Sequence, residues 1–453
     1  MNKAFVILFS SLVFVALSCE DKQTAEPQPE ELQDLTLNVV VEGDRIFSGK
    51  PTSVMQVGNP NATSMEASIM VRFNTDHKKV LETIEFTEQI PAGSTRDVTI
   101  TSSDNLAPGF YRASSFVNGK ASYHFNFGID PFDIVSAPDK QPDFDTFWEE
   151  ARKQLPAIDP ESVYMYEIAG KSNASCKVFF VELESVPDGP DGAPVLIHGY
   201  YLEPQDGKKH PVLMHFYGYD TLGSTSKVYC PSGDGQYAEF YLSHRGQYLN
   251  RTTVDKREPD GKGDFENIYG DWFAFNFGHK EGYYYRGAFM DCVQAVRFMA
   301  TRSTSDMGNL FAEGSSQGGA LSYACAALSD YPFTAIAPCV AFLGDYPDYF
   351  QIVDWPANVA RSSAKKEGMT DEEMYRFLSY FDTKNLATRI PASTAVMACS
   401  GLMDGTCPPH TNIAPFNNLA TKDKEYYFYP KMTHEIPGDW NSKMSKFFKE
   451  RIT

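Results

Sequence analysis

The sequence predicts an α/β fold, a mostly parallel sheet covered by helices on both faces, preceded by a small β-sandwich. Three observations carry this prediction. From about residue 35 to residue 131, apolar and polar residues alternate with a period of two, which indicates strands with one buried face. Beyond residue 136, short apolar runs alternate with segments of helical periodicity, as expected of a parallel sheet between helices. A glycine-flanked serine separates one such run from one such helix.

The composition is that of a folded globular protein with an acidic surface. Its 453 residues are 42% hydrophobic and 22% charged, and the formal net charge is -19. A chain of this length favours two or three domains. Because nucleic-acid binding needs basic patches, this charge argues against a nucleic-acid partner, and a neutral substrate fits it better.

The N-terminus has the pattern of a secretory signal. A short apolar run from Ala4 to Leu17 ends in Ala-Leu-Ser-Cys at Cys19, which is similar to the cleavage box of bacterial lipoproteins. We therefore expect residues 1–19 to be a lipoprotein signal peptide, Cys19 to be lipidated and residues 20–34 to form a polar tether. The protein would be exported and held by its acyl chains on the periplasmic or cell-surface face of the bacterial outer membrane. An ordinary signal peptide that contains a cysteine is the alternative.

Residues 35–135 are predicted to form a β-sandwich of immunoglobulin type. Leu35 to Val41 and Met65 to Phe73 alternate between apolar and polar residues, and Asn118-Gly119 stands between two alternating runs. Asn-Gly in this setting is a strong hairpin signal. Several short strands in about 100 residues, without a helical pattern, favour the immunoglobulin type. We favour a spacer or packing role for this domain, because the alternation reveals no aromatic platform. Carbohydrate binding is the alternative.

Residues 136–453 are predicted to form the α/β domain. An aspartate-capped helix is expected over residues 142–155, and helical spacing recurs around residues 289–299 and 321–328. Five apolar runs predict buried strands: 212–216, 240–242, 310–312, 394–399 and 426–429.

The segment FAEGSSQGGAL, residues 311–321, contains G-x-S-x-G with Ser316 at its centre. Between a strand and a helix this spacing indicates a nucleophile elbow, whose strained serine needs small residues two places before and after it. Gly314 and Gly318 meet this need. The backbone N–H of Gln317, at the start of the helix, would then face a developing oxyanion. A glycine-rich turn with an inert serine is the alternative.

A reactive serine needs a base and an acid, which follow it in the order Asp or Glu, then His, in the α/β-hydrolase fold. His410 and His434 are the histidines after Ser316. We favour His434, which follows the last predicted strand, because His410 lies only six residues from the preferred acid, Asp404. Two competing acids lack a buried strand before them: Asp382 and Asp423.

A second oxyanion donor is expected on the loop after an early strand. The segment VLMHFYGYDTLG has this form, with Gly218 allowing the turn and the N–H of Tyr219 facing the site. A small apolar pocket is expected near Tyr219.

The cysteines predict neither a metal site nor a cofactor. Seven follow Cys19, no two form C-x-x-C, and their spacing matches no zinc motif. Most lie in apolar runs and are expected to be buried. Cys399 and Cys407 flank a loop and are candidates for a disulfide.

Eight segments occur in the order found in one known family: PDFDTFWEE, HFYGYD, HRGQ, YYYRGAFMDCVQAVRFM, GSSQGG, LSYFDTKNLATRI, GLMDGTCPP and THE. On these segments the chain from about residue 142 onward resembles the acetyl xylan esterases and cephalosporin C deacetylases of carbohydrate esterase family seven. The resemblance implies Ser316 as nucleophile, Asp404 and His434 as its partners, and the amides of Tyr219 and Gln317 as the oxyanion hole. It also implies homo-oligomers, which family members often form as closed rings. The segment HFYGYD has tyrosine where the family usually has histidine. This difference bears on which leaving groups the enzyme prefers.

Arg245 and Asp291 lie within two of these segments. We interpret them as a buried structural ion pair that fixes a strand against a helix, and not as catalytic groups.

The expected function is hydrolysis of acetyl esters on carbohydrates, such as xylan and xylo-oligosaccharides, through an acetyl-serine intermediate. Two alternatives stay open. One is a serine peptidase of the prolyl oligopeptidase type, which shares the elbow and the order of the triad. The other is a non-catalytic, glycan-binding surface lipoprotein.

Overall fold

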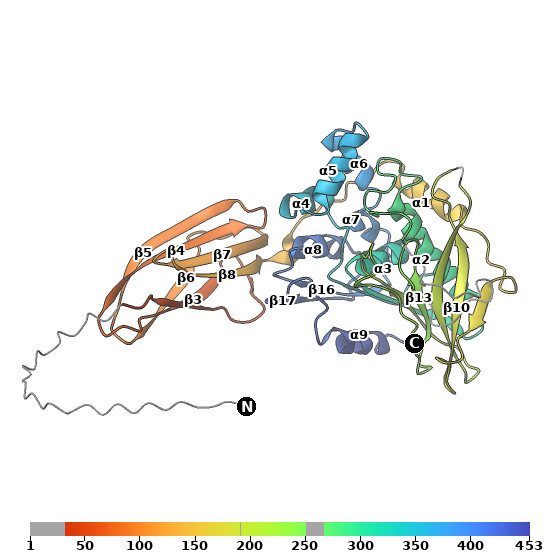
Figure 1. The fold of residues 1–453 in the computed structure, drawn as a ribbon, viewed down its shortest axis with the longest axis horizontal. Helices are drawn as coiled ribbons and strands as arrows, with labels where there is room; N and C mark the ends of the chain where they lie inside the picture. Colours follow the sequence, from red (N-terminus) through yellow and green to blue (C-terminus); the bar gives the residue numbers. More distant parts are fainter. Residues whose placement is uncertain (1–31, 191, 251–266) are drawn as a thin grey trace, which may run out of the picture.

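The computed structural model describes residues 32–190, 192–250 and 267–453. The predicted signal peptide, Cys19 and most of the tether lie outside these residues. An all-β unit lies beside a larger α/β unit (Figure 1). None of the described helices is both long and apolar enough to cross a membrane.

The all-β unit consists of two sheets that share one core. One sheet has the order β1-β3-β6 and the other β2-β8-β7-β4-β5. Ile69, Val71 and Phe73, which were predicted to face inward, are at most 1% exposed, whereas Leu37, Val41 and Met65 are only partly buried. Asn118 and Gly119 both have positive φ, 50° and 66°, and confirm the predicted hairpin between β7 and β8. The strands are β1 (Thr36–Val40), β2 (Ile46–Phe47), β3 (Thr52–Gly58), β4 (Met65–Thr75), β5 (Val80–Ile90), β6 (Thr95–Thr101), β7 (Gly109–Val117) and β8 (Ala121–Ile129).

The α/β unit is built on a nine-stranded sheet of order β17-β16-β15-β14-β12-β13-β11-β10-β9. Across the sheet from β13 to β17, each strand is parallel to its neighbours, as the sequence predicts. Strands β9, β10 and β11 add an antiparallel edge that the sequence pattern did not reveal. The strands are β9 (Tyr164–Glu167), β10 (Cys176–Ser185), β11 (Val195–Pro204), β12 (His210–Phe216), β13 (Ala238–Ser243), β14 (Ser305–Ser315), β15 (Ala335–Cys339), β16 (Ala395–Gly401) and β17 (Lys424–Tyr429).

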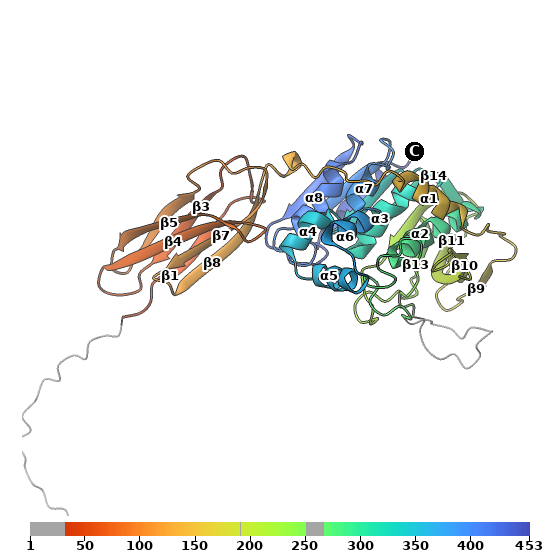
Figure 2. The same cartoon turned by 90° about the horizontal axis from the view of Figure 1, so that it is seen from above.

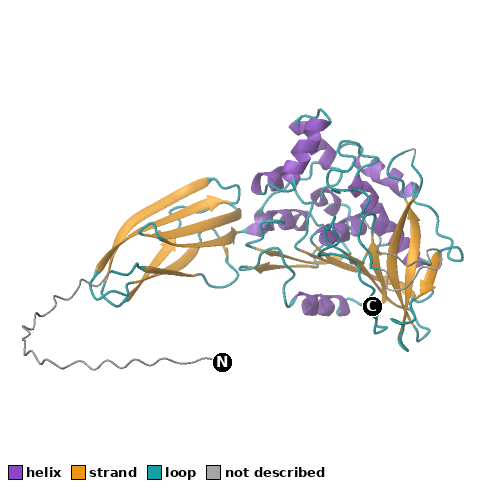
Figure 3. Ribbon diagram, viewed as in Figure 1, coloured by secondary structure: helices purple, strands orange, loops and turns teal. Residues whose placement is uncertain are grey.

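Helices cover both faces of this sheet, as Figures 1 and 3 show. Helix α9 (Trp440–Lys449) packs Trp440, Phe447 and Phe448 against one face. The central helices α2 (Tyr284–Ala300) and α3 (Gln317–Leu328) lie on the other face, in the main core. The remaining helices are α1 (Phe144–Lys153), α4 (Tyr346–Ile352), α5 (Ala357–Lys366), α6 (Asp371–Leu378), α7 (Thr383–Ala387) and α8 (Pro409–Asn417).

Two local predictions are wrong. Asp143 precedes α1, but its carboxylate makes no capping bond and instead accepts hydrogen bonds from Lys280 and Tyr380. All seven described cysteines are free, so the Cys399–Cys407 disulfide is not formed. The two residues belong to cores on opposite faces of the sheet, and the Cys399 Sγ lies 3.5 Å from the Cys339 Sγ.

The two units contact each other at one end of the sandwich, seen from above in Figure 2. The Asn126 side-chain amide of β8 donates to the Leu402 carbonyl at 2.7 Å. The ring of Phe110 packs on Phe428 of β17 with centroids 6.2 Å apart. The sandwich is therefore held directly against the loop that follows β16.

Candidate active site

Ser316 stands at a sharp turn between β14 and α3. Its φ of 56° and ψ of -121° are an unfavourable backbone conformation for a residue with a side chain, and such strain persists only where the surroundings enforce it. The glycines on either side allow the turn: a Cβ on Gly314 would lie 2.5 Å from Gly318, and one on Gly318 would lie 2.3 Å from the Phe216 carbonyl oxygen. The sequence thus folds locally into the strand–turn–helix that the G-x-S-x-G spacing predicts.

The structure brings Ser316, His434 and Asp404 together. The His434 Nε2 lies 3.0 Å from the Ser316 Oγ, and its Nδ1 lies 2.8 Å from the Asp404 Oδ2. The Asp404 side chain is fully buried, while that of His434 is 27% exposed. The backbone N–H groups of Thr406 and Cys407 each donate to the Asp404 Oδ1 at 2.8 Å. The carboxylate is therefore fixed so that it orients the imidazole, whose Nε2 can accept the serine proton.

The competing residues lie elsewhere. His410, on α8, lies 2.7 Å from Asp348 and 3.1 Å from Asp345. Asp382 caps α7 and accepts from three backbone N–H groups, and burial raises its pKa to about 7. Asp423 pairs with Arg451. Each of these residues thus has a structural partner of its own.

Two backbone amides are available near the nucleophile. Gln317 is the first residue of α3, so its N–H has no acceptor within the helix. Within the described residues, neither this amide nor that of Tyr219 donates to another protein atom. The loop after β12 that carries Tyr219 is held by the Asp220 carboxylate, which accepts from the N–H groups of Leu222, Thr225 and Ser226.

The side chain of Gln317 also has a role that the sequence did not reveal. It is fully buried, and its Oε1 accepts from the Tyr285 hydroxyl at 2.9 Å while its Nε2 lies 3.1 Å from the His244 Nε2. Burial lowers the pKa of His244 to about 4, so the ring is neutral near pH 7 and its Nε2 accepts this bond. The network fixes the first residue of α3, and with it the amide beside Ser316.

Arg245 and Asp291 form a buried pair, as their interpretation from the sequence requires. The Arg245 Nη2 and Nε lie 2.7 and 3.0 Å from the two Asp291 carboxylate oxygens. Their side chains are 1% and 0% exposed. The arginine follows β13 and the aspartate lies on α2, so the pair fixes the strand end against the helix. A Cβ on Gly287 would lie 2.1 Å from the Arg245 Nη1, so this glycine makes room for the guanidinium.

Aromatic rings gather beside the nucleophile. The Tyr219 ring lies 5.0 Å from Trp272 and 5.1 Å from Trp355, and Trp355 stacks on Phe342 at 5.4 Å. The Phe342 amide donates to the Ser316 carbonyl at 3.0 Å, which ties this cluster to the elbow. Tyr219 was expected to border an apolar pocket, whereas the contribution of Trp355 and Phe342 could not be read from the sequence.

Glu313, at the end of β14, is hydrogen-bonded to a histidine of the neighbouring strand β12. The sequence did not reveal this contact, because it depends on the order of the strands in the sheet. The His215 Nδ1 of β12 lies 2.7 Å from the Glu313 Oε1, and its Nε2 lies 2.9 Å from the Glu239 Oε2 of β13. Burial lowers the pKa of His215, but the hydrogen bonds to both glutamates outweigh it and raise the pKa to about 9. Glu313 is thus a counterion of a charged histidine beneath the elbow.

Comparison with known proteins identifies the family of the chain. A family model described as acetyl xylan esterase matches residues 134–451. The acetyl esterase Axe7A of Xylanibacter ruminicola is 25% identical over 381 residues, which cover 81% of each chain.

Solved structures agree as well. The acetyl xylan esterase from Paenibacillus sp. R4 is 26% identical, with a TM-score of 0.55, and the match covers 71% of this chain and 98% of that one. Acetyl xylan esterase 1 from Thermoanaerobacterium sp. JW/SL YS485 has the same TM-score and coverage at 24% identity. The α/β unit, with its large mostly parallel sheet, thus has the fold of these esterases.

Proposed function

Since this chain belongs to the acetyl xylan esterase family, we propose that it removes acetyl groups from the sugar hydroxyls of acetylated xylan and xylo-oligosaccharides. It does so as a serine esterase, through an acetyl-serine intermediate. The observation that carries the proposal is the continuous hydrogen-bonded chain from Ser316 through His434 to Asp404, within a family of acetyl esterases.

In the proposed reaction, the His434 Nε2 takes the proton of Ser316 as its Oγ forms a bond to the acetyl carbonyl carbon. The amides of Tyr219 and Gln317 stabilise the negative carbonyl oxygen of the tetrahedral intermediate. His434 then gives its proton to the sugar oxygen as the carbon–oxygen bond to the sugar breaks. Water attacks the acetyl-serine in the same way, releases acetate and restores the serine hydroxyl. Asp404 stays ionised throughout and stabilises the imidazolium.

Substitution of the nucleophile tests this proposal. Ser316→Ala should lose release of acetate from acetylated xylan and from nitrophenyl acetate by at least about 10³-fold. Ser315→Ala is the matched control, because it removes the neighbouring hydroxyl of the same motif and should stay close to wild type. Retained activity in Ser316→Ala, with an unchanged melting temperature, would refute the assignment of the nucleophile.

The two alternatives are weaker. A non-catalytic protein would be supported by Asp404 and His434 lying beyond hydrogen-bond reach, whereas they lie 2.8 Å apart. A serine peptidase would cleave aminoacyl anilides, so a panel of these substrates beside acetylated oligosaccharides separates the two activities.

We also propose that residues 35–135 form an immunoglobulin-like domain. The sheet orders β1-β3-β6 and β2-β8-β7-β4-β5 support this. The first corresponds to strands A, B and E of that fold, and β8, β7, β4 and β5 correspond to strands G, F, C and C′, with the short β2 added in parallel beside β8. An experimental structure of the full chain tests the assignment.

The proposed location is the bacterial outer membrane, with Cys19 as the lipidated residue. The support is the apolar run followed by Ser-Cys near the N-terminus. Cys19→Ala should abolish incorporation of labelled fatty acid and move the protein from the membrane fraction to the soluble fraction. The homo-oligomer implied by the family resemblance is tested by sedimentation of the mature protein.

A further inference from the structure

A cavity of about 400 Å³ lies between the β-sandwich and the loop that follows β16. Its volume is in the range of small-ligand sites. Asp404 and Gly405 of the loop form part of its wall, and Asn74, Arg112 and Asn126 of the sandwich form another part. The same loop therefore borders this cavity and positions the imidazole of the triad.

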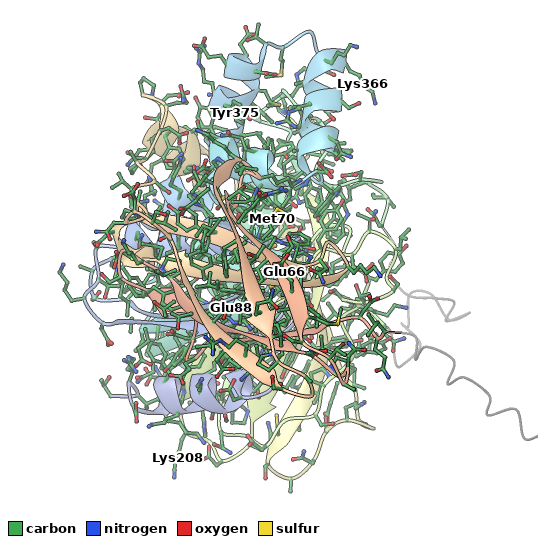
Figure 4. All side chains as sticks on the ribbon, turned by 90° about the vertical axis from the view of Figure 1, so that its left-hand side faces the viewer. Glu66, Met70, Glu88, Lys208, Lys366 and Tyr375 are labelled. Atoms are coloured by element: carbon green, nitrogen blue, oxygen red, sulfur yellow. The ribbon has the colours of Figure 1, made fainter. Side chains whose placement is uncertain are left out.

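The sandwich side of the cavity includes Phe110 and Tyr111 and a polar row that crosses three neighbouring strands. Asn74 of β4 pairs with Arg112 of β7, and Arg112 pairs with Asn126 of β8. Because side chains alternate along a strand, Asn74 lies on the same face of β4 as Glu66 and Met70, which Figure 4 labels on the sandwich in front of the α/β unit. This is the outer face of the sheet, away from the sandwich core.

The polar groups of this row are not used up within the protein. Two cations of the described sandwich, Arg96 and Lys120, form ion pairs with Glu88 and Asp34. Several others form none within the described residues, and of these Arg112 and Lys78 border the cavity. The Asn126 Nδ2 donates to the Leu402 carbonyl, but its Oδ1 is buried without a partner among the described residues. A buried acceptor without a partner is costly, and a ligand hydroxyl in the cavity would satisfy it.

The opposite wall is mostly apolar, apart from Asp404 and Gly405. Leu402, Met403, Pro408 and Pro409 border the cavity from the α/β unit. A sugar ring presents hydroxyl groups at its rim and C–H groups on its faces, so it matches a cavity with one polar and one apolar wall. Such a lining, mostly apolar with a few convergent polar groups, is typical of ligand sites.

We propose that this interdomain cavity is a saccharide subsite, in which the β-sandwich binds a sugar unit of the substrate other than the one that carries the acetyl ester. Arg112 and Lys78 donate hydrogen bonds to its hydroxyl groups, and the Asn126 Oδ1 accepts one. The inference rests on the proposed function, and it gives the sandwich a role in substrate binding in place of the spacer role expected from its sequence.

The test compares two double variants of the full chain. Lys78→Ala with Arg112→Ala removes both unpaired cations of the cavity. Arg96→Ala with Lys120→Ala is the matched control, because it removes one arginine and one lysine of the same domain that do not border the cavity. Both pairs are exposed, so both variants should fold, which melting temperatures check.

The readout is the ratio of kcat/KM for an acetylated xylo-oligosaccharide to kcat/KM for nitrophenyl acetate, which has no sugar. The cavity variant should lower this ratio about tenfold, equal to about 1.4 kcal/mol, mainly through a higher KM for the oligosaccharide. The control variant should keep the wild-type ratio. An unchanged ratio in the cavity variant, or an equal fall in the control, would overturn the subsite.

Failure of the proposed function gives a different result. If the wild-type protein hydrolyses nitrophenyl acetate but no acetylated saccharide, the proposed substrate class is wrong. The proposed subsite is then refuted as well. If the wild-type protein deacetylates the oligosaccharide and the cavity variant keeps the wild-type ratio, the substrate class stands and only the subsite is refuted.

Discussion

Removal of one partner of the Arg245–Asp291 pair should destabilise the protein strongly. In Asp291→Asn, the guanidinium would lose the two charged contacts of 2.7 and 3.0 Å while its side chain stays 1% exposed. The Asp188 carboxylate, 2.6 Å from the Arg245 Nη1, remains as an anionic partner. Its side chain is 29% exposed, so it replaces only part of the lost interaction. Breaking a buried pair from one side costs about 3–5 kcal/mol, whereas replacing both partners by apolar residues is often nearly neutral.

The assay is urea unfolding of Asp291→Asn and of the double variant Arg245→Met with Asp291→Leu, followed by a signal from the α/β unit. We expect the single variant to unfold at a clearly lower urea concentration than wild type and the double variant to recover most of the loss, with similar m-values. A single variant as stable as wild type would refute the structural interpretation. So would a double variant that is no more stable than the single one. A folded Asp291→Asn with a kcat lowered by orders of magnitude would instead indicate a catalytic role.

Three further predictions concern the triad, the elbow and the pH dependence of stability. Asp404→Asn should lower kcat for acetate release by about 10³–10⁴-fold at unchanged melting temperature, because the amide no longer holds the catalytic histidine in the correct tautomer; activity within tenfold of wild type would contradict this. Gly318→Ala would place a Cβ 2.3 Å from the Phe216 carbonyl oxygen and should lower the free energy of unfolding in urea by about 3 kcal/mol, whereas Gly170→Ala, where nothing lies within 4 Å, should be tolerated; equal effects would speak against the close packing. Two aspartates outweigh burial and raise the pKa of His410 to about 10. The protonated ring therefore stabilises the fold fully below pH 6.5, and this contribution, on the order of 3–5 kcal/mol, is lost as the pH rises from 6.5 to 10. The free energy of unfolding should fall over this range in wild type and less steeply in His410→Asn; parallel curves would refute the assignment.

The sequence by itself determined the parts of the site that are built locally. A nucleophile elbow depends on a few consecutive residues, so the segment FAEGSSQGGAL is enough to place the glycines around Ser316. The order of Ser316, Asp404 and His434 follows from where parallel strands end, and the apolar runs before them mark those strands. Alternation with a period of two likewise identified the core positions of the sandwich.

Only the tertiary structure decided which distant residues meet. Glu313 and His215 are 98 residues apart and become neighbours because β14 and β12 are adjacent in the sheet, an order that no local pattern encodes. The side-chain bond between Gln317 and His244 spans 73 residues for the same reason. The cavity beside Asp404 lies between two units whose relative position depends on contacts such as that of Asn126 with Leu402. Hydrophobic periodicity records which face of a strand is buried, but it carries no information about which strand or domain lies against that face.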